Sequence, residues 1–277
     1  MKKNRFLFVA MLFAALSLGF VSCDNKGNEP EDPQGEQTEQ NGSTENNGGE
    51  ETPEPESPVI DYNGHAYVDL GLPSGLKWAT CNVGATKPEE YGNYYAWGEV
   101  EPKEVYDWST YKFMDSSVND WNGVNKYTVA DSRNEYGDVV WYDNSGNFIG
   151  DNKTVLEKED DAATVNMGGS WRMPTKAEQQ ELIDECTWKW TNDYNGTGVA
   201  GLIVTSKSND NHIFFPAAGD RDGSDLNDAA GSGGDVWSSS LVGHSVSAYC
   251  LSFSYADADW SCCYCRYSGR SVRGVSK

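Results

Sequence analysis

The carboxyl-terminal stretch, Phe214 to Val275, limits the folds open to this chain more than any other segment. From Asn209 to Ser276 there is no Lys, Glu, Gln or Met, although all four residue types occur upstream. Asp, Ser, Gly, Ala, Tyr and Cys are used instead. Three segments resemble core and turn sequence and frame the stretch: Phe215 to Gly219, Trp237 to Ser240, and Gly269 to Arg273.

Residues 249–254 alternate in polarity, with Tyr249, Leu251 and Phe253 at odd positions and Cys250, Ser252 and Ser254 at even positions. A period of two is typical of a strand with one buried face. The pattern predicts a scaffold fixed by a few aromatic and glycine anchors. The small and polar residues between the anchors would then be exchangeable surface positions.

The first 22 residues have a basic start and then an apolar run from Phe6 to Val21. This is typical of a secretory signal peptide, and it is short for a membrane span. Ser22 before Cys23 resembles a bacterial lipobox, with Phe20 departing from the usual Leu, which predicts lipid attachment at Cys23. An ordinary cleaved signal with an incidental cysteine is the alternative.

Residues 23–58 are predicted to form a disordered acidic linker. From Asp24 to Pro58 there is no aliphatic or aromatic side chain, and the segment holds eleven acids and one Lys. Such a composition cannot bury enough apolar surface to offset the entropy of ordering. Residues 59–277 are then one folded domain whose 32 acids and 17 bases give it a charge of −15. That charge argues against nucleic acid or anionic lipid as a partner.

Local patterns in 59–277 predict an α+β domain with short strands, one clear helix and much loop. Thr175 and Glu178 form a capping box that predicts a helix within 170–185, and a helical turn is expected at 160–165. Strands are expected at 65–70 and 77–80, and a hairpin at 202–205 and 213–215. The polar segment 115–152 predicts an irregular excursion.

Several blocks of sequence resemble a known family. The blocks are Val68 to Gly75, Trp78 to Ala85, Tyr95 to Glu99, Gly168 to Thr175, and the three framing segments of the terminal stretch. Together they resemble the Fibrobacter succinogenes major paralogous domain, common in exported lipoproteins of Bacteroidetes-type bacteria. The resemblance implies a C-type-lectin-like fold related to that of formylglycine-generating enzymes. Gly274 departs from the Pro found in relatives.

The terminal stretch is also similar to the variable region of proteins diversified by retroelements. Randomising the adenines of Asn codons gives Asp, Ser, Tyr, Cys, Ala and Gly among others, but not Lys, Glu, Gln, Met or Trp. The residues used here fit that alphabet, and the similarity implies a variable ligand-binding region at about 220–268. A fixed binding surface is the alternative, since such surfaces also favour Tyr, Ser and Gly.

Neither the cysteines nor the short sequence motifs predict a catalytic, metal-binding or nucleotide-binding site. An exported context permits a disulfide between Cys81 and Cys186, with two free thiols as the alternative. The Cys262, Cys263 and Cys265 run lacks zinc-ligand spacing, and Gly196 to Gly201 precedes a strand pattern rather than a helix. No match to the calcium-binding loop of lectins or to the copper site of formylglycine-generating enzymes is found. We therefore expect no cofactor, no metal and no enzymatic activity.

The sequence predicts a lipid-anchored outer-membrane protein, exposed at the cell surface, that binds an unidentified protein or glycan ligand. The alternatives are an envelope protein of fixed sequence and, less favoured, an enzyme of the formylglycine-generating type. Trp237, Leu251, Phe253 and Trp260 would support the backbone. The predicted contact residues are Asp220, Asp222, Asp235, Ser247, Cys250, Ser252, Ser254, Tyr255, Asp257, Asp259, Ser261, Cys262, Tyr264 and Ser268.

Overall fold

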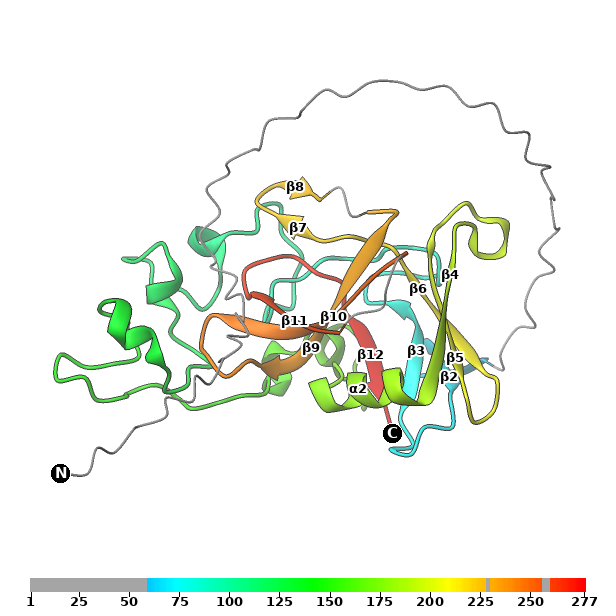
Figure 1. Ribbon diagram of the computed structural model, residues 1–277, viewed down its shortest axis with the longest axis horizontal. Helices are drawn as coiled ribbons and strands as arrows, with labels where there is room; N and C mark the ends of the chain where they lie inside the picture. Colours follow the sequence, from blue (N-terminus) through cyan, green and yellow to red (C-terminus); the bar gives the residue numbers. More distant parts are fainter. Residues whose placement is uncertain (1–58, 228–229, 256–259) are drawn as a thin grey trace, which may run out of the picture. The chain divides into compact units, whose positions relative to one another are not determined.

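The first and last strands of the folded region belong to one sheet. The computed structural model describes residues 59–227, 230–255 and 260–277. The predicted signal peptide, the predicted lipid-attachment residue Cys23 and the predicted linker lie outside these residues. The first sheet has the order β1-β2-β3-β12 and antiparallel pairing, so that the carboxyl-terminal strand lies beside β3 (Figure 1). Its strands are β1 (Val59–Tyr62), β2 (His65–Asp69), β3 (Lys77–Asn82) and β12 (Arg273–Ser276).

Two helices precede the second sheet. They are α1 (Ala162–Met167) and α2 (Lys176–Glu185). The Thr175 side chain accepts from the Glu178 backbone and Glu178 accepts from the Thr175 backbone, so the predicted capping box is present. The sheet that follows has the order β4-β5-β6, with β4 (Cys186–Thr191), β5 (Gly201–Ser206) and β6 (His212–Pro216).

The terminal stretch forms the third sheet, in the order β11-β10-β9, with antiparallel pairing. Its strands are β9 (Gly233–Leu241), β10 (Ser247–Ser254) and β11 (Trp260–Cys265). A small hairpin of β7 (Arg221–Asp222) and β8 (Asp225–Leu226) precedes it. Gly219 bridges to Gly234 and Arg221 to Gly269, so the hairpin is tied to both ends of the stretch.

The polar segment 115–152 contains no β-strand and no α-helix, and within it the described structure has only 3₁₀ turns at Trp121–Gly123 and Ser132–Tyr136. Figure 1 shows this excursion, in green, extending away from the sheets. Asp160 holds it to the domain by accepting from Lys112, Lys126 and Tyr127 at 2.7, 2.5 and 2.6 Å. The prediction of an irregular excursion is therefore confirmed.

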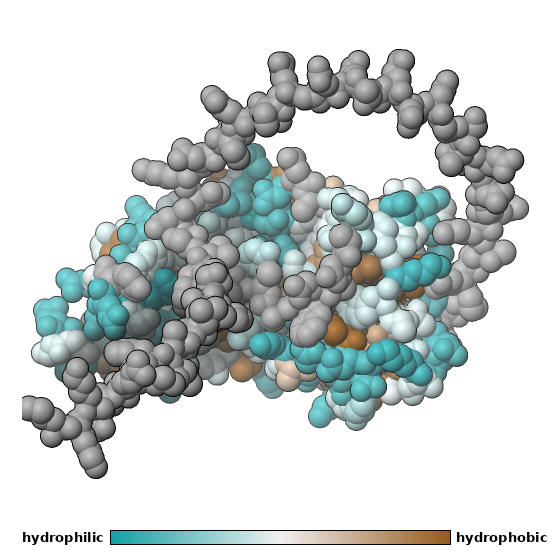
Figure 2. Space-filling view, in the orientation of Figure 1, coloured by the Kyte–Doolittle hydropathy of each residue, from teal (hydrophilic) through white to brown (hydrophobic). Residues whose placement is uncertain are grey.

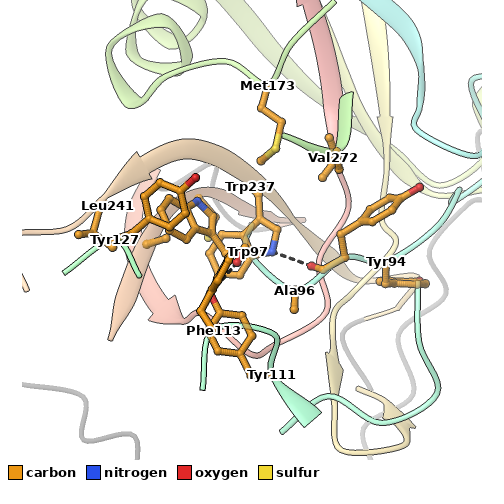
Figure 3. Close-up of a cluster of buried hydrophobic side chains, with 14 of the residues drawn as sticks. Tyr94, Ala96, Trp97, Tyr111, Phe113, Tyr127, Met173, Trp237, Leu241 and Val272 are labelled. Carbon is orange, nitrogen blue, oxygen red and sulfur yellow. Dashed lines mark hydrogen bonds between the residues drawn. The ribbon is translucent and has the colours of Figure 1, made fainter. Parts of the chain in front are cut away.

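Two groups of buried side chains form the core, and β10 contributes to both. The first core includes Trp97, Trp237, Ala248 and Cys250, together with the aromatic residues of Figure 3. The second core includes Trp78, Phe215, Leu251 and Phe253. Because successive strand residues point to opposite faces, Ala248 and Cys250 enter the first core while Leu251 and Phe253 enter the second.

Two fully buried arginines, Arg266 and Arg273, join distant segments by donating to backbone carbonyls. Arg266 donates to the carbonyls of Lys126, Tyr127 and Ser245 and from Nε to the Tyr111 hydroxyl. Its guanidinium also lies over the Trp97 ring at 4.8 Å. It therefore ties the excursion and the β9–β10 loop to the first core.

Arg273 has the same role at the second core. It donates to the carbonyls of Ala79, Thr80 and Phe214 and from Nε to Asn82 Oδ1. Its guanidinium lies 4.4 Å from the centroid of the Phe215 ring. One side chain thus joins β3, β6 and β12 and satisfies polar backbone groups at the edges of two sheets.

The expected disulfide between Cys81 and Cys186 is wrong, because both residues are free thiols. Cys81 lies on β3 of the first sheet, whereas Cys186 begins β4 of the second sheet and is buried in the second core. Among the remaining cysteines, Cys265 is disulfide-bonded.

The strands expected at 65–70 and 77–80, the hairpin around 208–211 and the helix before residue 186 are confirmed, with ends shifted by a few residues. In the part of the chain that the structure describes, no helix is both long and apolar enough to cross a membrane. On the face shown in Figure 2 the coloured surface is mostly hydrophilic or intermediate, and hydrophobic residues appear as small separate spots.

The Arg266→Lys variant should lose about 3–5 kcal/mol of unfolding free energy, because an ammonium cannot reach the four acceptors that the guanidinium serves. The matched control is Arg133→Lys, since Arg133 is only half-buried and stacks on Trp121. Urea denaturation followed by tryptophan fluorescence measures both. Equal losses in the two variants would contradict the role assigned to Arg266.

Candidate functional site

The structure divides the predicted contact residues into three groups. Those with accessible side chains are Asp220, Asp222, Ser252, Ser254 and Tyr264, which are half-buried, and Tyr255, which is 72% exposed. Those that are buried are Asp235, Ser247, Cys250 and Ser268. Asp257 and Asp259 lie outside the described residues, as do the side chains of Ser261, Cys262 and Trp260 on β11.

The prediction that Asp235, Ser247, Cys250 and Ser268 face outward is wrong, because all four residues are buried. Cys250 is 1% exposed because its side chain enters the first core, whereas Tyr249, on the opposite face of β10, is half-buried. Ser247 pairs with Cys265 of β11 and is 4% exposed. The Ser268 N–H donates to the Cys265 carbonyl at 3.1 Å in a tight turn, which encloses its side chain.

The accessible residues at the end of β10 and directly after it, Ser252, Ser254 and Tyr255, continue the two opposite faces of the strand. Tyr255 follows Leu251 and Phe253 in the alternation, and its ring contacts the half-buried Trp190 of β4 edge-on at 6.5 Å. Ser252 and Ser254 follow Cys250 on the other face. The single patch expected from the sequence is therefore two surfaces that meet at the end of β10.

The face that carries Ser252 changes from apolar to polar along the strand. Trp237 and Cys250 are paired across β9 and β10 in the first core, and the next pair on this face is Asp235 with Ser252. The Cys250 thiol lies 3.8 Å from Asp235 Oδ1. The core thus ends in a carboxylate that remains 8% exposed.

Arg270 lies against this polar end. Its Nε is 3.5 Å from Asp235 Oδ2, and its Nη2 is 3.7 Å from Asp220 Oδ2. Its guanidinium carbon is 4.9 Å from the Trp237 ring and 3.9 Å from the Tyr264 ring. With the nearby Asp222, these residues form what we call the carboxylate–guanidinium cluster: Asp220, Asp222, Asp235 and Arg270.

Arg270 differs from Arg266 and Arg273 in how its donors are used. It is only 2% exposed, yet its Nε and Nη1 make no hydrogen bond to any residue that the structure describes. Both distances to the aspartates are longer than a good hydrogen bond. Buried polar groups normally have hydrogen-bond partners. The buried Arg270 nitrogens that lack acceptors therefore lower the folding stability at this position.

Burial disfavours the charged form of two acids of the cluster, Asp222 and Asp235. Burial raises the pKa of Asp235, an effect that the Arg270 guanidinium opposes. Burial also raises the pKa of Asp222, and the neighbouring charge of Asp220 adds to that rise. Burial and the Asp222 carboxylate together raise the pKa of Tyr267, whose hydroxyl bonds Asp222, to about 12. Perturbed acids of this kind gather at functional sites.

The cluster offers carboxylate acceptors and guanidinium donors side by side, which suits hydrogen-bond recognition. In the described ranges no three His, Cys, Asp or Glu side chains are grouped closely enough to hold a metal ion. The sequence placed Asp220, Asp222 and Asp235 at the site but assigned Arg270 to the frame and did not single out Tyr267. Arg270 could have been found from its charge, since an arginine among small residues needs partners when buried.

The Asp222→Asn variant should be more stable than the unchanged chain at pH 7. A folded-state pKa above the unfolded value favours the protonated acid, so the stabilisation is complete at low pH and is lost as pH rises through the folded pKa. Asn does not ionise and can still accept from Tyr267. The gain in melting temperature should therefore shrink as the pH is lowered towards 4, measured by circular dichroism.

Asp225→Asn is the control for that experiment, because Asp225 pairs with Asp222 in the same hairpin but is exposed. It removes the same charge without a burial cost. A gain of equal size in both variants at pH 7 would show that net charge, and not burial of Asp222, governs the effect.

Comparison of the chain with protein-family models found no match, and comparisons with curated proteins and with solved structures found no match either. The function therefore has to be argued from the chemistry and geometry of this chain.

Proposed function

We propose that this protein is a lipid-anchored lipoprotein of the outer membrane that binds a ligand at the cell surface through the third sheet. The domain would have a C-type-lectin-like fold, and its ligand-facing residues would be retroelement-diversified. The observation that carries the proposal is the separation of roles within β10. Leu251 and Phe253 are buried, while Ser252, Ser254 and Tyr255 are accessible.

The scaffold supports this role because its anchors do not depend on the accessible residues. Trp237 is fully buried, and its indole N–H donates to the Tyr95 carbonyl at 2.9 Å (Figure 3). The Val236–Ser271 and Arg221–Gly269 bridges hold the strands through backbone atoms and do not involve the side chains of Ser252, Ser254 and Tyr255. Exchange of the accessible side chains should therefore leave the fold intact.

The composition of the accessible surface also supports binding. Tyr gives a large contact area at a low entropy cost, and Ser and Asp supply adaptable hydrogen bonds. Tyr255 is among the most exposed of the large apolar residues in the described ranges, and it is braced by Trp190. A rigid aromatic ring beside small polar groups is typical of a recognition surface.

The triple variant Ser252→Asn, Ser254→Asn, Tyr255→Ser should change which ligand is bound while the melting temperature moves by less than about 2 °C. Binding is measured on arrays of cell-surface proteins and glycans. The control triple, Ser116→Asn, Ser145→Asn, Ile149→Ser, alters exposed residues of the excursion. Ligand binding unaffected by the first triple, or equally affected by both, would rule out this surface.

Sequencing of the locus in sibling isolates tests diversification. Substitutions should concentrate at Asp222, Ser252, Ser254 and Tyr255, at codons that match an adenine-rich template copy beside a reverse-transcriptase gene. The codons of the buried anchors Trp237, Leu251, Phe253 and Arg270 should be constant. Uniformly low variation across the stretch, with no template copy, would favour the fixed envelope protein instead.

A further inference from the structure

Within the carboxylate–guanidinium cluster the guanidinium is the under-satisfied group. Each aspartate already accepts a side-chain hydrogen bond: Asp220 from Asn227, Asp222 from Tyr267 and Asp235 from Cys250. Arg270 keeps two N–H positions without an acceptor among the described residues, although it is buried. Asp220 and Asp235 lie 3.7 and 3.5 Å from it, too far for strong hydrogen bonds. A ligand that fits here must therefore supply acceptors to Arg270, and donors on the same ligand can use the acceptor positions that the carboxylates have left.

This requirement excludes simple ions. An anion would satisfy Arg270 but would face the charges of Asp220, Asp222 and Asp235. A cation would satisfy the aspartates but offers no acceptor to Arg270. A carboxamide carries an acceptor oxygen and donor N–H groups on one planar unit, so it can bond to both.

The access route favours a group that projects from a larger partner. Arg270 is buried against the half-buried ring of Tyr264, whereas Asp220, Asp222 and Ser252 are partly exposed around it. The guanidinium is thus buried beneath partly exposed acceptors, and a ligand group that reaches it has to displace the Tyr264 ring. The exposed Tyr255 at the end of β10 adds the kind of aromatic contact that protein-binding surfaces use.

We propose that the cluster is the anchoring subsite of the binding surface and takes a neutral carboxamide, an Asn or Gln side chain or a backbone amide, of a protein partner. This inference rests on the proposed binding function. The raised pKa of Asp222 is consistent with it, since a donated hydrogen bond from a ligand amide would favour the ionised carboxylate that burial disfavours.

Three planar probes of nearly equal shape test the inference: benzamide, benzoate and benzamidinium. Each is titrated into the ¹⁵N-labelled chain, and the Arg270 Nε–H and Ser252 backbone signals are followed by NMR. Methyl glucoside is titrated as a neutral polyol. Benzamide should give saturable shifts at both signals, and the other three compounds should bind more weakly or not at all.

The variants Arg270→Lys and Asp222→Asn should each weaken benzamide binding by about tenfold, the value of one hydrogen bond to a charged group. Asp222 is half-buried, so its variant remains informative if Arg270→Lys fails to fold. Asp225→Asn, in the same hairpin but exposed, should bind benzamide as the unchanged chain does.

The inference would be overturned if benzoate, benzamidinium or methyl glucoside bound more tightly than benzamide, or if benzamide did not bind. Equal benzamide affinities for the Asp222 and Asp225 variants would also overturn it. Binding of methyl glucoside alone would indicate a glycan partner. The two proposals can fail separately. If the Ser252, Ser254 and Tyr255 triple variant binds different ligands on the arrays but the unchanged chain does not bind benzamide, the subsite inference is wrong and the proposed binding function stands.

Discussion

The domain depends on buried guanidinium groups that bind backbone carbonyls. Arg266 and Arg273 together serve six carbonyls, which come from the excursion, the β9–β10 loop, β3 and β6. A chain with so much loop has many carbonyls that no sheet ladder satisfies, and a fixed fork of five donors can collect several at once. The aromatic rings around each guanidinium lower the cost of burying its charge. Both arginines lie within the last twelve residues, so the loops are secured only when the carboxyl-terminal strand is in place.

Placement of β10 between two cores is the second constraint, and it explains why the binding surface is narrower than its composition indicates. Over the first half of the strand one face, with Ala248 and Cys250, is occupied by core side chains, and Cys250 is as buried as Leu251. Only beyond Asp235 and Ser252 does one face become polar. Exchangeable positions are therefore confined to the end of the strand and to the segments beside it. Ser247 and Ser268 are small because they are tightly packed. They are the same residue type as the accessible Ser252 and Ser254, but they are buried.

Arg270 shows how the same residue type can have different roles in one fold. Its neighbours Arg266 and Arg273 have their N–H groups bonded to carbonyls and a few other oxygens, whereas Arg270 faces two aspartates at longer distances. Burial raises the pKa of two nearby acids, Asp222 and Asp235. A fold selected only for stability would replace such a group or satisfy it. Its retention beside the most accessible part of the sheet is what makes this end of the domain the candidate binding surface.

The sequence by itself determined the local elements. The capping box of Thr175 and Glu178, the hairpin around 208–211 and the two strands around Leu72 to Gly75 follow from short-range patterns that act within a few residues. The alternation of residues 249–254 also predicted a strand correctly. Only the tertiary structure decided which face of that strand is solvent, because burial of Cys250 and Ser247 depends on segments more than a hundred residues away that pack above and below β10. The pairing of Arg270 with Asp220 and Asp235, and the separation of Cys81 from Cys186, were likewise fixed by contacts between sheets that no local pattern encodes.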